Sequence, residues 1–414
     1  MHSSSIFTCY LKLIEWQAFS VTIGSLAVCL SYYYLCIGRK PQLVAGPKSK
    51  FIKFLLDHCS ILEEPFWPTP WCFGGRAQTI IGSLLKSHPI VKYRRELLHI
   101  PDGGELFLDW LDNGSLTAKS SNTFPTVLIL PGLTGTSQHG YVLHFVKEIE
   151  QLGYRAVVLN NRGLGGARLR TPRAFCAANT EDLEFVISHI HNTYPGIPLI
   201  AVAVSLGGII LTNYLSKFSG ENFPGLLAAM TISVPWDLFR SADSLEEPVN
   251  SLLLNRHLAN LLCKLVRDNT IMVEALKEDK PNIRLNHILQ SRTVREFDNR
   301  LIAPMFGFKD SSEYYAAASL HSKPLHLINI PLLCLSAEDD PFAPVDTLPL
   351  DKIKSCPNVV MVLTSRGGHI GYTEGLIPSG RGYADRLMSQ YVKSIIESGH
   401  LLNAGETAEV NQRK

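Results

Sequence analysis

The sequence lacks the charge excess and the cysteine spacing that several protein classes require. Its 39 Lys and Arg residues nearly balance 37 Asp and Glu residues, so the net charge is only +2. No basic stripe interrupts this balance, which argues against a nucleic-acid-binding surface. The nine cysteines are odd in number and show neither CxxC nor Cys/His metal spacing. We therefore interpret them as reduced thiols, and we expect no metal ion, no organic cofactor and no nucleic-acid partner.

Charge is also absent from residues 16–38, a run long enough to cross a hydrocarbon layer of about 30 Å as a helix. Trp16 at one end and Tyr32 near the other suit the two membrane interfaces. A cleaved signal peptide is the competing interpretation, but the bulky stretch up to Ile37 offers no small-x-small cleavage site. We therefore predict a tail over 1–15 and an uncleaved, single-pass anchor in the lipid bilayer over 16–38.

Two signals disagree about the orientation of this anchor. Arg39, Lys40 and Lys48 follow the span, whereas Lys12 precedes it, so the positive-inside rule places the large domain in the cytoplasm. A glycosylation sequon, Asn113-Gly-Ser115, would matter only in a lumenal domain. The orientation therefore stays open at this point.

Residues 39–89 are expected to form a connector between the anchor and the main domain. Its stretch over 65–71 has too many prolines for regular structure and too many aromatic residues for disorder. We expect this stretch to pack over the main domain or to lie at the membrane surface. The domain proper is expected over 90–399, followed by a polar tail over 400–414.

Within 90–399 the hydrophobic pattern alternates between strands and helices. A hairpin is predicted across the turn Pro101 to Gly104, and a polar surface loop over 113–123 follows it. Strands then alternate with helices up to a last helix that starts at Tyr383. This alternation predicts an α/β fold, a mostly parallel sheet with helices on both faces.

The interval over 240–325 interrupts this alternation with helical segments, two of which are expected over 250–267 and 270–277. An insertion at this point lies above the carboxyl ends of the strands, where sites form in such sheets. We therefore expect a cap that either shapes an apolar pocket or packs against the core.

The main chemical signal is the apolar run Leu199 to Val204, which breaks at Ser205 and restarts after Gly207 and Gly208. A strand that turns sharply into a helix at a serine exposes the Oγ and leaves the next N–H free. The usual pattern is Gly-x-Ser-x-Gly, whereas Ala203 takes the first position here. Because the turn requires only small side chains, alanine permits it, and Ser205 is the candidate nucleophile.

Two further groups with suitable chemistry, Asp340 and His369, each come just past a predicted strand. A serine hydroxyl becomes nucleophilic when a neutral imidazole takes its proton, and a buried carboxylate must orient that imidazole. The order Ser, Asp, His along the chain therefore predicts a catalytic triad of Ser205, Asp340 and His369. We interpret Glu338 and Asp339 as solvated neighbours.

Such a triad also requires backbone N–H groups aimed at the developing oxyanion. Leu206 follows the nucleophile and is one expected donor. The loop after the strand predicted over 126–130 contains Gly132 and Gly135, which let it turn beside the serine. Leu133 is therefore the second expected donor.

With these motifs in place, the sequence resembles the membrane-anchored branch of the α/β-hydrolase superfamily, close to the α/β-hydrolase-domain-containing proteins 1 and 3. The resemblance covers residues 40–399 and rests on collinear segments: Lys40-Pro-Gln-Leu-Val, Leu130-Pro-Gly-Leu-Thr-Gly-Thr, Val204-Ser-Leu-Gly-Gly, Arg295-Glu-Phe-Asp298, Asp339-Asp-Pro-Phe and Gly367-Gly-His-Ile-Gly371. It implies an α/β-hydrolase fold with a helical cap and the same triad. It also implies hydrolysis of carboxylic esters in membrane lipids, phosphatidylcholines among them, and a type II orientation. Arg295 and Asp298 are expected as a structural ion pair.

Three functions follow from these patterns. The first is hydrolysis of lipid esters, phospholipids or acylglycerols, through an acyl-enzyme. The second is acyl transfer to an alcohol or lysolipid, although no histidine is followed by Asp at the His-x-x-x-x-Asp spacing of some related hydrolases. The third is a non-catalytic membrane scaffold that keeps the fold, for which the departure at Ala203 leaves room.

Overall fold

The structure is a computed structural model of the 414-residue chain. The part that it describes comprises residues 2–112, 124–218, 225–280 and 283–402. The sequon, the rest of the polar loop expected over 113–123 and the end of the tail lie outside these ranges.

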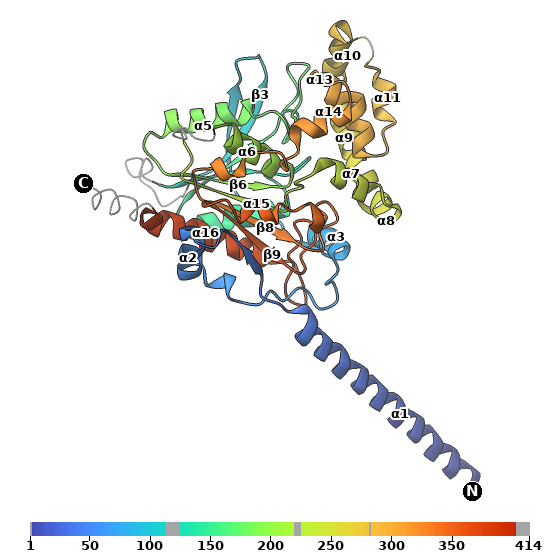
Figure 1. Cartoon of the computed structure of the whole chain (residues 1–414). Coiled ribbons are helices and arrows are strands. Elements are labelled where there is room, and N and C mark those ends of the chain that lie inside the picture. Colours follow the sequence, from blue (N-terminus) through green and yellow to red (C-terminus); the bar gives the residue numbers. More distant parts are fainter. Residues whose placement is uncertain (1, 113–123, 219–224, 281–282, 403–414) are drawn as a thin grey trace.

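One long helix, α1 (His2–Tyr32), projects from the α/β body (Figure 1). A short π-helical segment, Tyr33–Ile37, continues it. The stretch Ile14–Ile37 is 24 residues long, and a window within it has a mean hydropathy of 1.6 and is almost wholly exposed. It is therefore long and apolar enough to cross a membrane, as the sequence predicted.

The described residues form one nine-stranded sheet with the order β1-β9-β8-β7-β6-β4-β5-β3-β2. The six strands β4 to β9 are parallel to one another. At one edge β1 is antiparallel to β9, and at the other edge β3 is antiparallel to β5 and β2 is antiparallel to β3. The mostly parallel sheet and the hairpin of β2 and β3 are thus confirmed. The strands are β1 (Gln42–Val44), β2 (Arg94–His99), β3 (Glu105–Leu111), β4 (Thr126–Leu130), β5 (Arg155–Asn160), β6 (Leu199–Val204), β7 (Ala228–Ile232), β8 (Leu332–Ala337) and β9 (Val359–Thr364).

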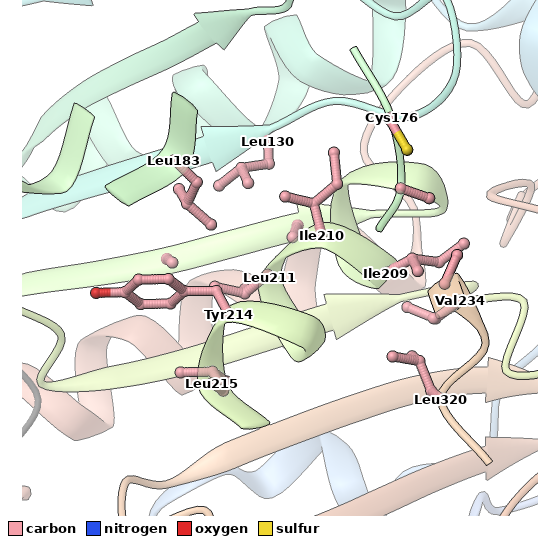
Figure 2. Packing of buried hydrophobic residues seen from close by; sticks show 14 of the residues in the cluster. Leu130, Cys176, Leu183, Ile209, Ile210, Leu211, Tyr214, Leu215, Val234 and Leu320 are labelled. Atoms are coloured by element: carbon pink, nitrogen blue, oxygen red, sulfur yellow. The ribbon is translucent and has the colours of Figure 1, made fainter. Parts of the chain in front are cut away.

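Helices cover both faces of this sheet. Apolar residues of α2, α4 and α16 share a buried cluster with side chains of one sheet face. Those of α5 and α6 share a second cluster with the other face, where Leu183, Ile210 and Leu211 gather near Leu130 (Figure 2). Both faces are therefore buried, which explains why the parallel strands are continuous apolar runs. The bounds of these helices are α2 (Lys50–His58), α4 (Gly140–Gln151), α5 (Glu181–Thr193), α6 (Leu206–Lys217) and α16 (Tyr383–Ser398).

Between β7 and β8 the described residues form helical elements that stand together to one side of the sheet, yellow to orange in Figure 1. The helix expected over 250–267 is divided: a π-helical segment, Ser251–Asn255, precedes α9. The helix expected over 270–277 is present as α10. The elements of this cap are α7 (Leu238–Glu246), α8 (Pro248–Asn250), α9 (Arg256–Asp268), α10 (Thr270–Asp279), α11 (Leu285–Leu289), α12 (Val294–Phe297), α13 (Ala303–Met305) and α14 (Ser311–Ala318).

The segment 39–89, expected as a connector, is integrated into the body. It supplies edge strand β1, helix α2 and a further helix, α3 (Gly75–Leu85). Phe51 and Leu55 of α2 are buried against α16 and the sheet. The proline- and aromatic-rich stretch runs between α2 and α3 and buries Phe66 in the same cluster.

Candidate active site

Ser205 lies at the turn between β6 and α6. Its φ of 51° and ψ of −118° fall in a region that residues with side chains rarely adopt. The Ser205 N–H donates to the Ile232 carbonyl oxygen at the end of β7 at 2.9 Å, so the sheet holds the strained turn. A Cβ at Gly207 would lie 2.5 Å from the Leu130 carbonyl oxygen. The small residue that the motif predicted here lets the turn pack against the end of β4.

His369 lies between Ser205 and Asp340, and all three side chains are buried. Its Nε2 is 2.9 Å from the Ser205 Oγ, and its Nδ1 is 2.9 Å from the Asp340 Oδ2. Asp340 follows β8 and His369 follows β9, so the carboxyl ends of parallel strands bring the three groups together. This geometry permits the imidazole to take the serine proton while the carboxylate fixes its tautomer.

Further contacts hold the acid and the imidazole in place. The Asp340 Oδ1 accepts the N–H groups of Phe342 at 2.7 Å and Ala343 at 3.3 Å. The Phe342 ring stacks on the His369 imidazole, with ring centroids 3.9 Å apart and planes 18° apart. The aromatic residue that follows the Asp-Pro motif therefore forms one wall of the histidine site.

Two hydroxyl groups that the motifs did not indicate hold the loop that carries the histidine. The Thr79 Oγ1 of α3 accepts the His369 N–H at 2.8 Å, and the Ser233 Oγ accepts the Ile370 N–H at 3.0 Å. No sequence motif indicates either hydroxyl, because a hydroxyl that accepts a distant backbone N–H leaves no local pattern. Thr79 comes from the segment expected as a connector, which therefore contributes to the site.

The prediction that Asp339 is a solvated neighbour of the triad is wrong. It is largely buried, and its Oδ1 accepts the Gly368 N–H at 2.9 Å. Burial raises the pKa of its carboxyl to about 6. A Cβ at Gly75 would lie 1.8 Å from the Asp339 carbonyl oxygen, so the start of α3 can approach this loop only because it lacks a side chain. Glu338 is exposed, as expected.

The two expected oxyanion donors flank the serine. Leu206 is the first residue of α6, so its N–H has no acceptor within the helix. The loop after β4 approaches closely, because a Cβ at Gly132 would lie 3.2 Å from the Ser205 Cβ. The Gly132 N–H donates to the Tyr141 hydroxyl at 3.0 Å, which orients the loop. Leu133, the next residue, lines the same cleft as Ser205 and Leu206.

This cleft opens over Ser205 beneath the cap and has a volume of about 670 Å³, its mouth included. Helix α7 lines one side of it, and α9 and α12 contribute further side chains. Most of the lining groups are apolar, which suits the hydrocarbon chain of a lipid ester. Those from the cap include Leu238, Ala242, Leu245, Leu258, Val294 and Tyr315.

The sequence profile of a family described as alpha/beta hydrolase fold matches residues 125–376. The chain belongs to the α/β-hydrolase family. A relative from Homo sapiens named phospholipase ABHD3 is 45% identical over 379 residues, which cover 91% of this chain and 90% of that protein. A monoacylglycerol lipase of Saccharomyces cerevisiae is 31% identical over 357 residues, covering 77% of this chain and 78% of that protein.

Two solved structures are similar to this chain at low sequence identity. The Pyrococcus furiosus esterase PF2001 is 14% identical, with a TM-score of 0.46, and the match covers 75% of this chain and 97% of that chain. The α/β-hydrolase domain-containing protein 10 from mouse is also 14% identical, with a TM-score of 0.43 over 73% of this chain and 98% of that chain.

A second pocket of the hydrolase, about 510 Å³ with its opening included, adjoins the cleft and is almost wholly apolar. Four residues line both cavities: Leu133, Leu206, Asp298 and Tyr314. The second pocket extends between α9 and the segment 174–177. The structure supports both roles considered for the cap: it shapes apolar pockets, and its buried side chains join the core cluster on one face of the sheet.

The prediction of an ion pair between Arg295 and Asp298 is wrong. Arg295 lies 2.5 Å from the Asp243 carboxylate and 3.3 Å from that of Glu246, both on α7. Asp298 is buried where the two cavities meet, and its Oδ2 accepts the Tyr315 hydroxyl at 2.9 Å. Burial raises the pKa of Asp298 to about 7. The hydrolase thus keeps an acidic group where the mostly apolar cleft meets the almost wholly apolar second pocket.

Other chemistry is less prominent in the part of the chain that the structure describes. There, no three His, Cys, Asp or Glu side chains gather closely enough to hold a metal ion. The described cysteines are free thiols, with Cys29 and Cys36 exposed on the α1 region and the others buried.

Proposed function

We propose that this hydrolase is a membrane-anchored serine esterase that cleaves carboxylic esters of lipids. The observation that carries the proposal is the 2.9 Å separation of the Ser205 Oγ and the His369 Nε2 at one end of an apolar cleft. The names of the relatives, a phospholipase and a monoacylglycerol lipase, support a phospholipid or an acylglycerol as the substrate.

In the proposed reaction, Ser205 attacks the ester carbonyl carbon while His369 takes its proton and Asp340 stabilises the imidazolium. The N–H groups of Leu133 and Leu206 donate to the oxyanion. His369 then returns the proton to the leaving alcohol, and an acyl-enzyme remains. Water, deprotonated by His369, attacks the acyl carbon, and the fatty acid leaves as the serine is restored.

Residues 16–38 serve in this proposal as a single-pass anchor in an endomembrane, and the cap over 240–325 belongs to the hydrolase domain over 90–399. The anchor holds the domain at the bilayer that contains its lipid substrate. The local concentration of lipid is therefore high, and the cleft needs no additional binding affinity for it. The segment 39–89 follows the anchor and packs into the body as β1, α2 and α3, and the tail over 400–414 comes last. The apolarity and exposure of α1 support this arrangement.

Labelling with a fluorophosphonate probe tests the chemistry. In membranes that contain the full chain, we expect the wild type to label and the Ser205→Ala variant not to label. Hydrolysis of phospholipid or monoacylglycerol by that variant should fall by about 10⁶-fold, the usual cost of losing a serine nucleophile. The matched control is Ser83→Ala, which changes an exposed serine of α3 and should label normally. A folded wild-type chain that fails to label contradicts the proposal.

A further inference from the structure

The end of the anchor packs against the proline- and aromatic-rich stretch. The Tyr33 hydroxyl donates to the Pro68 carbonyl oxygen at 2.6 Å. The ring of Trp67 lies 5.5 Å from that of Tyr33 and 5.2 Å from that of Tyr34, centroid to centroid. Tyrosine and tryptophan are the residues enriched at the membrane–water interface. We call these contacts among Tyr33, Tyr34, Trp67 and Pro68 the joint. If α1 spans a bilayer, the joint therefore marks the level at which the bilayer meets the body.

Three exposed apolar side chains lie beside this joint. Pro68 forms an antiparallel bridge with Glu374, and the Trp71 Nε1–H donates to the Leu376 carbonyl oxygen at 2.8 Å. Trp71 is 53% exposed, Leu376 74% and Ile377 80%. We name Trp71, Leu376 and Ile377 the apolar tip. Adjacent large apolar groups left this exposed indicate a surface that something apolar covers.

We propose that the apolar tip inserts into the interfacial region of the same bilayer that holds α1. This inference rests on the proposed function, because it takes α1 as a membrane anchor. Continuity with the joint argues for lipid, since the short stretch 67–71 contacts both the end of α1 and the tip. Exposed Arg39 and Lys40 beside α1 add positive charge, which anionic headgroups attract.

Two residues of the apolar tip, Leu376 and Ile377, share one loop with His369, between β9 and α16. Between them, the Thr373 N–H donates to the Gln78 Oε1 at 2.8 Å, and the Thr373 carbonyl oxygen accepts the Thr69 N–H at 3.0 Å. The loop is thereby fixed to the segment that follows the anchor. Helix and tip together give two membrane contacts, which restrict the tilt of the body and present the cleft to lipid in one orientation.

Fluorescence of Trp71 tests the proposal without any catalysis. The full chain with Ser205→Ala is reconstituted into dioleoylphosphatidylcholine vesicles with or without brominated phosphatidylcholine. The same chain with Trp71→Phe is measured in parallel, so that the difference is the signal of Trp71. We expect brominated lipid to remove most of this signal, and Leu376→Ser/Ile377→Ser to restore it. A Trp71 signal that brominated lipid leaves unchanged in vesicle-bound protein overturns the proposal.

Leu97→Ser is the matched control, because Leu97 is 41% exposed on β2, at the opposite edge of the sheet from β1. It should leave the quenching unchanged. On the chain with an intact Ser205, the Leu376→Ser/Ile377→Ser variant should lose activity on phosphatidylcholine vesicles and keep wild-type activity on a water-soluble ester. Equal loss on both substrates overturns the docking role.

Failure of the proposed function gives a different pattern. If the full chain does not float with vesicles in a density gradient, residues 16–38 do not anchor it in a bilayer, and both proposals are overturned. A chain that floats and whose Trp71 is quenched, yet hydrolyses no ester, supports the apolar tip and contradicts the enzymatic proposal.

Discussion

Thr79 accepts the N–H of His369 and donates to the Gly75 carbonyl oxygen, each at 2.8 Å. It does not line the cleft, so it is a positioning residue. Thr79→Val keeps the shape and removes the acceptor, and we expect kcat to fall about tenfold, equivalent to a hydrogen bond of about 1.4 kcal/mol. KM for a water-soluble ester should stay the same, because the cleft is untouched. Thr79→Ser should restore kcat, whereas a changed KM with normal kcat would contradict this role.

Asp298 should make stability depend on pH. Its folded-state pKa of about 7 lies above the ordinary 3.8 of an aspartate, so the folded state keeps a proton that the unfolded state loses. Stability therefore falls as the pH rises from about 4 to about 7 and then levels. Asp298→Asn cannot ionise and still accepts the Tyr315 hydroxyl. Its thermal midpoint in detergent should rise relative to wild type at pH 8 more than at pH 5; a pH-independent difference would contradict the assignment.

The grouping of Ser205, Asp340 and His369 was predictable from the sequence because each residue combines a reactive side chain, a preceding apolar strand and a nearby glycine or proline. Asp298 was placed in the wrong interaction, since Arg295 matched it in charge and proximity along the chain. What the sequence could not convey is that α7 supplies carboxylates to Arg295.

At the scale of elements, the segment 39–89 is where the sequence was least informative. Strand β1, Gln42–Val44, is too short to show a period of two, and helix α3 starts at Gly74-Gly75, which resembles a turn. The long parallel strands, in contrast, are buried on both faces and were read from their continuous apolar runs. Short elements that are stabilised by tertiary contacts leave little trace in the sequence.

Two truncations separate the anchor from this segment. A chain that lacks residues 1–38 keeps β1, α2 and α3, so we expect it to fold and to label with a fluorophosphonate. A chain that lacks 1–89 loses the buried Phe51 and Leu55 and the Thr79 contact, so we expect a large drop in thermal stability and in labelling. Circular dichroism and probe labelling measure both. Normal labelling of residues 90–414 would show that this segment is dispensable.

At the scale of the whole molecule, alternation of strands and helices predicted the layered sheet and the position of the cap. It could not predict the joint at which the anchor meets the body. The contacts of Tyr33 with Pro68 and of Trp71 with Leu376 join segments through single hydrogen bonds and ring packing. Such contacts follow from the folded shape and have no periodic signature.

The pairing of β1 with β9 also bears on how the chain is made. Among the strands that the structure describes, β1 is synthesised before the others and β9 after them, and Thr79 lies 290 residues before the His369 that it holds. Domains assemble during synthesis from the N-terminus, and contacts between distant segments form late. In the proposed arrangement the anchor enters the bilayer while the histidine loop does not yet exist. Under that proposal, the triad becomes complete only after translation has passed His369 and β9 can pair with β1.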